Sequence, residues 1–172
     1  VFFPDAGLFA WSLDGVELWK QPTPVSTTMH GLSGSLIVHD GRLFHLVDQL
    51  SDSHLTAYDA ATGQQVWKQE RVCGITGGYS TPVVYSPKEG DAQLITTGPL
   101  EVVAYNVATG ARVWWVVGKS NAPVSSPMLI DDRVYVCEPV GEPLPMSMLA
   151  PLDRNKDSIL EVKEATGNEA IR

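Results

Sequence analysis

Residues 55–67 read LTAYDAATGQQVW, and this stretch decides the fold because it recurs twice more along the chain. The other copies are LFAWSLDGVELW at residues 8–19 and VVAYNVATGARVW at residues 102–114. The alanine at the third position of each copy recurs every 47 residues, and the tryptophans that end the copies are 48 and 47 residues apart. Self-similarity at one fixed period of this size indicates a repeat architecture.

A second motif lies between these copies and repeats at a similar period. Residues 34–38 read GSLIV, residues 80–84 read STPVV and residues 125–129 read SSPML, with starts 46 and 45 residues apart. Two motifs that share one period indicate a single repeating structural module. Each copy precedes a turn and a further apolar strand, expected at Arg42–His45, Gln93–Thr96 and Arg133–Cys137.

Each repeating unit has the composition of antiparallel strands joined by tight turns. Short runs rich in Val, Leu, Tyr and Trp are typical of strands. Gly41, Gly63 and Gly110 follow Asp or Thr at expected turns, where glycine readily adopts a positive φ. Four strands in 47 residues is the size of one propeller blade. We therefore predict an all-β fold: a partial β-propeller of about three and a half four-stranded antiparallel blades. The expected blade segments are residues 2–20, 34–69, 80–117 and 125–137, within a propeller region at residues 1–140.

A blade has two apolar faces and must stack on its neighbours to bury them. The tryptophan that ends each copy is expected to wedge between blades, where an aromatic side chain buries on the order of 200 Å². The repeated alanine is small at the place where the adjacent sheet comes close. The residues expected to dock the blades are Ala57, Asp59, Gly63, Trp67, Ala104, Gly110, Trp114 and Trp19.

The pattern Ala-x-Asp-x-x-Thr-Gly-x-x-x-Trp, complete at residues 57–67, resembles the tryptophan-docking repeat of the propellers named after pyrroloquinoline quinone (PQQ) enzymes. Asn106 replaces the Asp in the third copy, and the first copy has Ser12 there and one residue fewer before Gly15. The resemblance covers about residues 2–140 and extends to the PQQ-binding-like repeat proteins of a secreted bacterial group. It implies a propeller fold and a periplasmic or extracellular location.

Composition and charge exclude several classes of partner. The formal charge is −8 and the basic residues are scattered singly, which argues against a nucleic-acid partner or an anionic membrane surface. No run of 18 apolar residues is present, so no membrane span is expected in this segment. No signal peptide is visible, and the chain opens and ends in mid-pattern, as expected of a piece of a longer protein. Cys73 and Cys137 lie 64 residues apart, and both a disulfide and packing as small apolar groups stay open.

The name of the repeat raises the question of a bound quinone. Quinoprotein dehydrogenases that resemble this fold use an Asp base, a calcium ion, a Trp floor under the quinone and often a vicinal disulfide. None of these is assignable here, and many proteins with this repeat bind no quinone, including a scaffold lipoprotein of outer-membrane barrel assembly. We therefore expect no PQQ. The scattered histidines favour surface or structural roles over a catalytic or metal site, although His30 is placed to face the central channel; they are His30, His39, His45 and His54.

Residues 141–172 differ from the repeats: a proline-rich linker leads into a loop that resembles an EF-hand. Residues 153–164 read DRNKDSILEVKE, with oxygen-bearing side chains at positions 1, 3, 5, 9 and 12. These positions, with the backbone carbonyl at position 7, are the ligand arrangement of an EF-hand calcium loop. Ser158 occupies position 6, where glycine normally makes the sharp turn, so we expect calcium affinity to be lowered rather than lost. The alternatives are a solvated acidic loop and a degenerate loop without the ion. The expected calcium ligands are Asp153, Asn155, Asp157, Ile159, Glu161 and Glu164.

The sequence favours a non-catalytic role, a secreted or periplasmic scaffold or binding module with a calcium-binding loop. Its expected partner is a protein or a small ligand on the propeller face. The alternative is a fragment of a PQQ-dependent dehydrogenase, so the sequence leaves the question of an enzyme open. An open array of blades has two unstacked faces, and we expect the isolated chain to be marginally stable or to self-associate.

Overall fold

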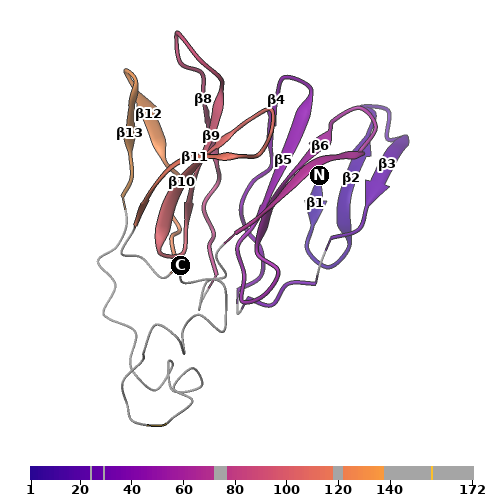
Figure 1. The fold of residues 1–172 in the computed structure, drawn as a ribbon. Coiled ribbons are helices and arrows are strands. Elements are labelled where there is room, and N and C mark those ends of the chain that lie inside the picture. The colour runs from indigo at the N-terminus through magenta and orange to yellow at the C-terminus, as the bar shows by residue number, and fades with distance from the viewer. Residues whose placement is uncertain (24, 29, 72–76, 118–121, 138–155, 157–172) are drawn as a thin grey trace.

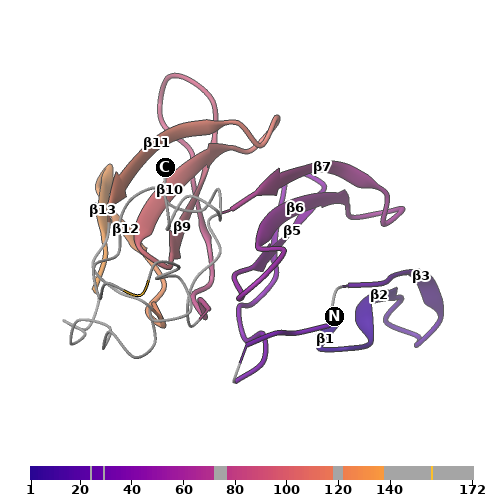
Figure 2. The same ribbon diagram turned by 60° about the horizontal axis from the view of Figure 1, so that its bottom comes forward.

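The computed structural model describes residues 1–23, 25–28, 30–71, 77–117, 122–137 and 156. Its thirteen strands form four antiparallel sheets, which stand side by side in chain order (Figure 1). Seen from one end, the sheets follow an arc, as the blades of a propeller do (Figure 2). The predicted all-β fold and partial propeller are confirmed. Within the described ranges, no helix has the length and apolar character needed to cross a membrane.

The first two sheets come from the N-terminal half of the chain. The first blade has three strands, β1 (Phe2–Phe3), β2 (Gly7–Trp11) and β3 (Glu17–Gln21). The second blade has four strands in sequential order, β4 (Ile37–His39), β5 (Arg42–Val47), β6 (His54–Asp59) and β7 (Gln65–Glu70).

The third and fourth sheets repeat this arrangement. The third blade has four strands, β8 (Val83–Tyr85), β9 (Gln93–Gly98), β10 (Glu101–Asn106) and β11 (Arg112–Val117). The described part of the fourth blade is the hairpin of β12 (Met128–Ile130) and β13 (Arg133–Tyr135). The first strand of each blade lies at its inner edge, and β8 contacts β12 of the next blade. The last strand, β7 or β11, is the outer edge.

The hydrophobic core is divided among the contacts between blades. Leu55 and Ala57 of β6 pack with Val103 and Tyr105 of β10 in a cluster between the second and third blades. Tyr58, on the opposite face of β6, packs with Leu8 of the first blade. Successive side chains of a strand point to opposite faces, so each central strand supplies one face to each neighbour. A third cluster joins the third blade to the fourth in the same way.

The turns before the outer strands explain the Asp/Asn-x-x-Thr-Gly pattern. Asp59 Oδ1 accepts hydrogen bonds from the backbone N–H groups of Ala61 and Thr62 and from the Thr62 hydroxyl, at 3.1, 2.8 and 2.8 Å. Asn106 Oδ1 accepts the two equivalent backbone bonds in the third blade. Gly63 then has φ +73°, in the left-handed region that favours glycine. Asn can replace Asp here because either side-chain oxygen closes the turn.

Hydroxyl groups link the inner edges of consecutive blades. The backbone N–H of Ser35 donates to Thr81 Oγ1 of the next blade, at 3.0 Å. The backbone N–H of Thr81 donates in turn to Ser126 Oγ of the fourth blade, also at 3.0 Å. The second repeated motif therefore places a hydroxyl where the preceding blade has a free backbone donor.

Candidate functional site

Two tryptophans cross from one blade to the next and rest on a glycine. The Trp19 indole N–H donates to the carbonyl oxygen of Ala60 in the second blade, at 3.0 Å. The ring of Trp19 covers Gly63 so closely that a Cβ there would lie 2.6 Å from a ring carbon. Side-chain atoms essentially never approach so closely, so any residue larger than glycine at position 63 would displace the Trp19 ring.

Trp67 repeats this contact one blade further on. Its indole N–H donates to the carbonyl oxygen of Val107, at 3.1 Å, and a Cβ at Gly110 would lie 2.7 Å from its ring. Trp114 differs, because its indole N–H donates to Gln93 Oε1 in its own blade, at 2.9 Å. The Trp114 ring packs in the cluster between the third and fourth blades.

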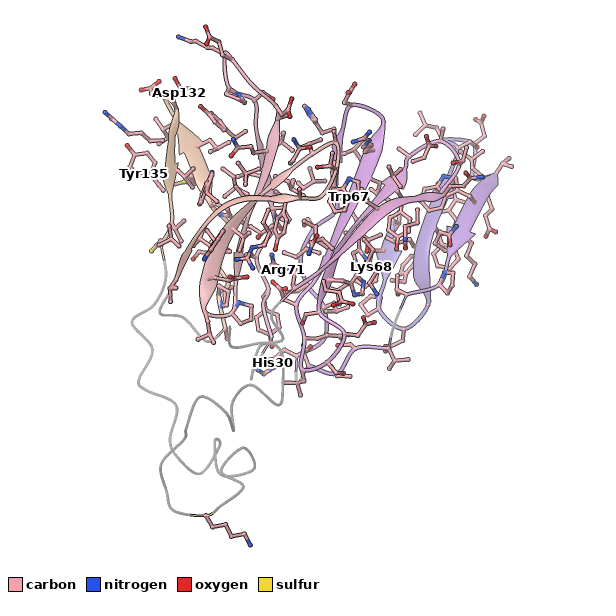
Figure 3. All side chains as sticks on the ribbon, in the orientation of Figure 1. His30, Trp67, Lys68, Arg71, Asp132 and Tyr135 are labelled. Atoms are coloured by element: carbon pink, nitrogen blue, oxygen red, sulfur yellow. The ribbon has the colours of Figure 1, made fainter. Side chains whose placement is uncertain are left out.

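A buried ion pair, which sequence reasoning missed, lies between the second and third blades. The Arg71 guanidinium, just after β7, donates to both carboxylate oxygens of Asp48, at 2.7 and 3.0 Å. A third guanidinium nitrogen donates to the hydroxyls of Thr96 and Tyr105 in the third blade, at 2.9 and 2.7 Å. Figure 3 shows Arg71 between the two sheets. A Cβ at Gly98 would overlap the guanidinium, so the site is enclosed.

Each side chain of this pair supplies the opposite charge that burial of the other one requires. Both side chains are almost fully buried, at 2% exposure for Arg71 and 0% for Asp48. Burial alone would lower the pKa of Arg71, but the neighbouring Asp48 carboxylate raises it, so the guanidinium stays charged. A bidentate pair with further hydroxyl acceptors is the geometry that a buried charge requires. The network therefore fixes the second blade against the third and leaves no free functional group.

Between the first and second blades, a histidine occupies the strand position that Thr96 occupies between the second and third blades. Ala57 and Ala104 are equivalent, so His45, paired with Thr56, corresponds to Thr96, paired with Val103. His45 is 1% exposed, and neither ring nitrogen has a hydrogen-bond partner among the described residues. Burial, with a smaller effect of nearby His54, lowers the pKa of His45 to about 4. His45 is thus a neutral core histidine, with the Phe2 ring centroid 4.5 Å from its own.

Loops of three blades meet at the end of the propeller where His30 lies (Figure 3). The exposed His30 ring lies 6.0 Å, centroid to centroid, from the ring of Tyr79 in the next blade. The backbone N–H of Tyr79 donates to the carbonyl oxygen of Pro123, which leads into the fourth blade. Gln49 Oε1 accepts from the backbone N–H of Thr27, at 3.1 Å, and so ties the His30 loop to the turn after β5. We call the surface formed by residues 25–28, 30–31, 48–53 and 77–80 the end face.

The other predicted residues are placed as follows. Ala57 and Ala104 are fully buried, and hydrogen bonds from Thr62 lower the pKa of the half-buried Asp59. His54 is buried, and its Nδ1–H donates to the carbonyl oxygen of Asp52, at 2.7 Å. Cys137 is exposed, while Cys73 lies outside the described residues. The six expected calcium ligands also lie outside the described residues: Asp153, Asn155, Asp157, Ile159, Glu161 and Glu164.

Comparison with known proteins gives one family and several related folds. The sequence model of the family described as "Outer membrane protein assembly factor BamB" matches residues 4–169. The comparison with curated protein sequences gave no match.

Among solved structures, the chain is similar to BamB from Moraxella catarrhalis, with a TM-score of 0.58 and 16% identity over 80% of this chain. It is also similar to the quinohemoprotein alcohol dehydrogenase from Comamonas testosteroni, with a TM-score of 0.49 and 19% identity over 66% of this chain. The chain spans 38% and 20% of the lengths of these two proteins. At these identities the structural likeness concerns the fold alone.

Proposed function

Because the chain belongs to the PQQ-repeat propeller family described as the outer membrane protein assembly factor BamB, we propose that it is a non-catalytic scaffold that binds protein partners in the periplasm. The polar groups buried between its second and third blades support this proposal. Arg71, Asp48, Thr96 and Tyr105 are engaged with one another and hold the blades together. Such an arrangement serves a rigid platform rather than chemistry.

The end face is the surface that best suits a protein partner. Its loops are held by hydrogen bonds from three blades, including those of Gln49 and Tyr79. Loops on a rigid scaffold are where binding residues gather, and preorganised loops lose little conformational entropy on binding. His30 and Tyr79 offer exposed and half-buried rings there, and aromatic residues are enriched at protein interfaces.

Site-specific photo-crosslinking tests this role. A photo-reactive amino acid at position 30 of the full-length protein should give a crosslink to a defined protein in the periplasm of the living cell. The same substitution at Glu89, in the turn between β8 and β9 at the other end of the blade, is the matched control. Equal crosslinking at both positions, or none at position 30, would contradict binding at the end face.

The dehydrogenase alternative requires a site for a quinone that carries several carboxylates. An open pocket of about 340 Å³ lies at the inner edge of the first two blades, lined by Phe2, Pro4 and residues 32–36. Ser33 and Ser35 are the lining residues with polar side chains, and none of the described residues that line the pocket is cationic. Buried carboxylates require cationic or hydrogen-bonding partners, so this pocket does not fit PQQ. Quinone absorbance and dye-linked alcohol oxidation after incubation with PQQ would support the dehydrogenase alternative instead.

We also propose that the loop at residues 153–164 binds calcium and stabilises the protein. The support is the spacing of its oxygen ligands, which matches an EF-hand loop. Extracellular calcium is abundant enough for weak sites, and a ligand that binds only the folded state stabilises it. Such an ion would act on stability rather than as a signal.

Titration calorimetry with Ca²⁺ tests this loop. The Glu164→Gln variant should bind Ca²⁺ far more weakly than the unchanged chain, because it loses the bidentate ligand at position 12. Glu169→Gln makes the same charge change outside the loop and should bind as the unchanged chain does. Equal heats in Glu164→Gln and the unchanged chain would remove the site.

A further inference from the structure

The outer strand of the third blade differs from the outer strands of the first two. The position after the docking tryptophan is Lys20 in β3 and Lys68 in β7, but Trp115 in β11. These positions are equivalent in the sheet, since Lys20, Lys68 and Trp115 pair with Phe9, Thr56 and Val103 of their central strands. Val116 and Val117 follow Trp115, whereas Gln69 and Glu70 follow Lys68.

The outer edge of β11 is therefore apolar and open. Trp115 is 59% exposed, Val116 60% and Val117 78%. Among the described residues β11 pairs only with β10, so every second backbone N–H and C=O of β11 points outward without a strand to meet it. Natural edge strands are protected from pairing by charges, and lysine is the commonest guard. The first two blades have that guard and the third lacks it.

The charge nearest to this edge is already neutralised within the blade. The Arg112 guanidinium forms an ion pair with Glu101, at 2.7 Å, and lies 4.7 Å from the centre of the Trp115 ring. No charged residue occurs from Val113 to Val117. The edge thus offers a partner a hydrogen-bonding ladder and apolar side chains, but no charge to be matched.

We propose that β11 pairs with β11 of a second copy of this chain, antiparallel and centred on Trp115, so that the sheets of two third blades become one continuous sheet. A two-fold axis perpendicular to the sheet places each residue opposite one from the same face. Trp115 then lies opposite Trp115 of the second copy, Trp114 opposite Val116, and Val113 opposite Val117.

The same pairing is unfavourable at β3 and β7. A two-fold axis at the equivalent position would place Lys20 opposite Lys20, or Lys68 opposite Lys68. Lys68 forms an exposed ion pair with Asp52, at 3.0 Å, so the repulsion is stronger at β3 than at β7. Like charges directly opposite destabilise a pair of strands, whereas aromatic pairs stabilise it. A self-complementary patch around a two-fold axis is the commonest arrangement of homo-oligomers. The lost lysine therefore selects the third blade, and the pairing extends the hydrogen-bonding ladder of β8–β11.

Sedimentation equilibrium of the full chain tests this proposal, with Trp115→Lys as the decisive variant. The unchanged chain should dimerise, and Trp115→Lys, which restores the residue of the other two blades, should be a monomer. Its melting temperature should match that of the unchanged chain at concentrations too low for the dimer to form. Val66→Lys, at the exposed position before the docking tryptophan of β7, is the matched control and should dimerise. A chain that is monomeric at about 100 μM would overturn the proposal, since even the protomers of a weak specific dimer associate at that concentration.

Crosslinking separates this dimer from association through another surface. In a chain whose two cysteines are replaced by serine, Trp115→Cys should form an intermolecular disulfide, because opposite residues of antiparallel strands have Cα atoms about 4.5–5.5 Å apart. Val66→Cys should not. Association through the aromatic face of Phe3, Phe9 and Trp11, or pairing of β11 with a strand of another protein, would leave Trp115→Cys uncrosslinked. Either result would overturn the proposal.

Discussion

At the scale of single residues, the contacts between blades depend on an aromatic ring of one blade and the absence of a side chain in the next. Trp67 lies on Gly110, and Trp19 on Gly63, with an indole hydrogen bond to a backbone carbonyl beside each glycine. The glycine has two functions, since it also adopts the positive φ that the turn needs. Substitution separates these two functions.

We predict that Gly110→Ala destabilises the protein more than Gly41→Ala. Both glycines have a positive φ, +76° and +69°, so alanine costs about 1 kcal/mol of backbone strain at each. Nothing lies within 4 Å of a Cβ at Gly41, whereas a Cβ at Gly110 would meet Trp67. The free energy of unfolding should therefore fall by about 2 kcal/mol more in Gly110→Ala than in Gly41→Ala. Urea unfolding measures the difference, and equal losses of stability in the two variants would contradict the close contact of Trp67 with Gly110.

The Arg71–Asp48 pair leads to a second prediction. Arg71→Met should lower the free energy of unfolding by on the order of 3–5 kcal/mol, because it leaves a buried carboxylate without its partner. The double variant Arg71→Met, Asp48→Leu should recover much of that loss, since no charge then stays buried. Urea unfolding of the three proteins decides. A double variant as unstable as the single one would show that the carboxylate is not the cause.

His45 predicts how stability depends on pH. Its pKa is about 4 in the folded chain against an ordinary value of 6.5, so the unfolded chain binds more protons between these pH values. The stabilisation is complete above pH 6.5 and is lost as the pH falls towards 4, by roughly 3 kcal/mol. Melting temperatures from pH 7 to 4.5 should fall less in His45→Phe than in the unchanged chain. Parallel curves would contradict a buried neutral His45.

At the scale of elements, the turn before each outer strand is a transferable unit. Asp59→Asn should leave the melting temperature nearly unchanged, because Asn106 closes the equivalent turn of the third blade with the same backbone bonds. Asp59→Ala should lower it by a few degrees, because the acceptor of three hydrogen bonds is lost. Differential scanning calorimetry compares the two variants. Asp59→Asn would have to melt as low as Asp59→Ala to contradict the shared turn.

The strands could be predicted from the sequence because the motif of each strand recurs in several blades. The strand expected at Arg42–His45 extends to Val47, and the one expected at Arg133–Cys137 ends at Tyr135, so boundaries differ by two residues. The Trp–Gly contact also recurs at the period of the repeat. Signals that repeat can be compared with one another, and their agreement identifies the blade.

The ion pair of Arg71 and Asp48 could not be found in this way. Thr23 stands at the position of Arg71 in the first blade, four residues after the docking tryptophan. No period therefore marks Arg71, and its partner lies 23 residues away in the preceding turn. His45 was equally hidden, because a single histidine in an apolar strand has the same sequence signature whether it is buried or exposed.

At the scale of the whole molecule, the described blades form an arc (Figure 2). The first blade presents Phe9 stacked on Trp11, with ring centroids 5.1 Å apart, on the face turned away from the second blade. The chain spans 38% of the BamB structure to which it is similar. We therefore expect the array of described blades to be less stable than a closed ring, because within the described ranges no blade covers the outer face of the first one.

Tryptophans that cross from one sheet to the next join the blades and so hold the whole array together. Hydrogen exchange of the five indole N–H groups, followed by NMR, tests this role most directly. Trp19 and Trp67 donate to carbonyls of the next blade and should exchange only when blades separate, far more slowly than the exposed Trp11. If Trp67 exchanged as fast as Trp11, the blades would not be docked in this way.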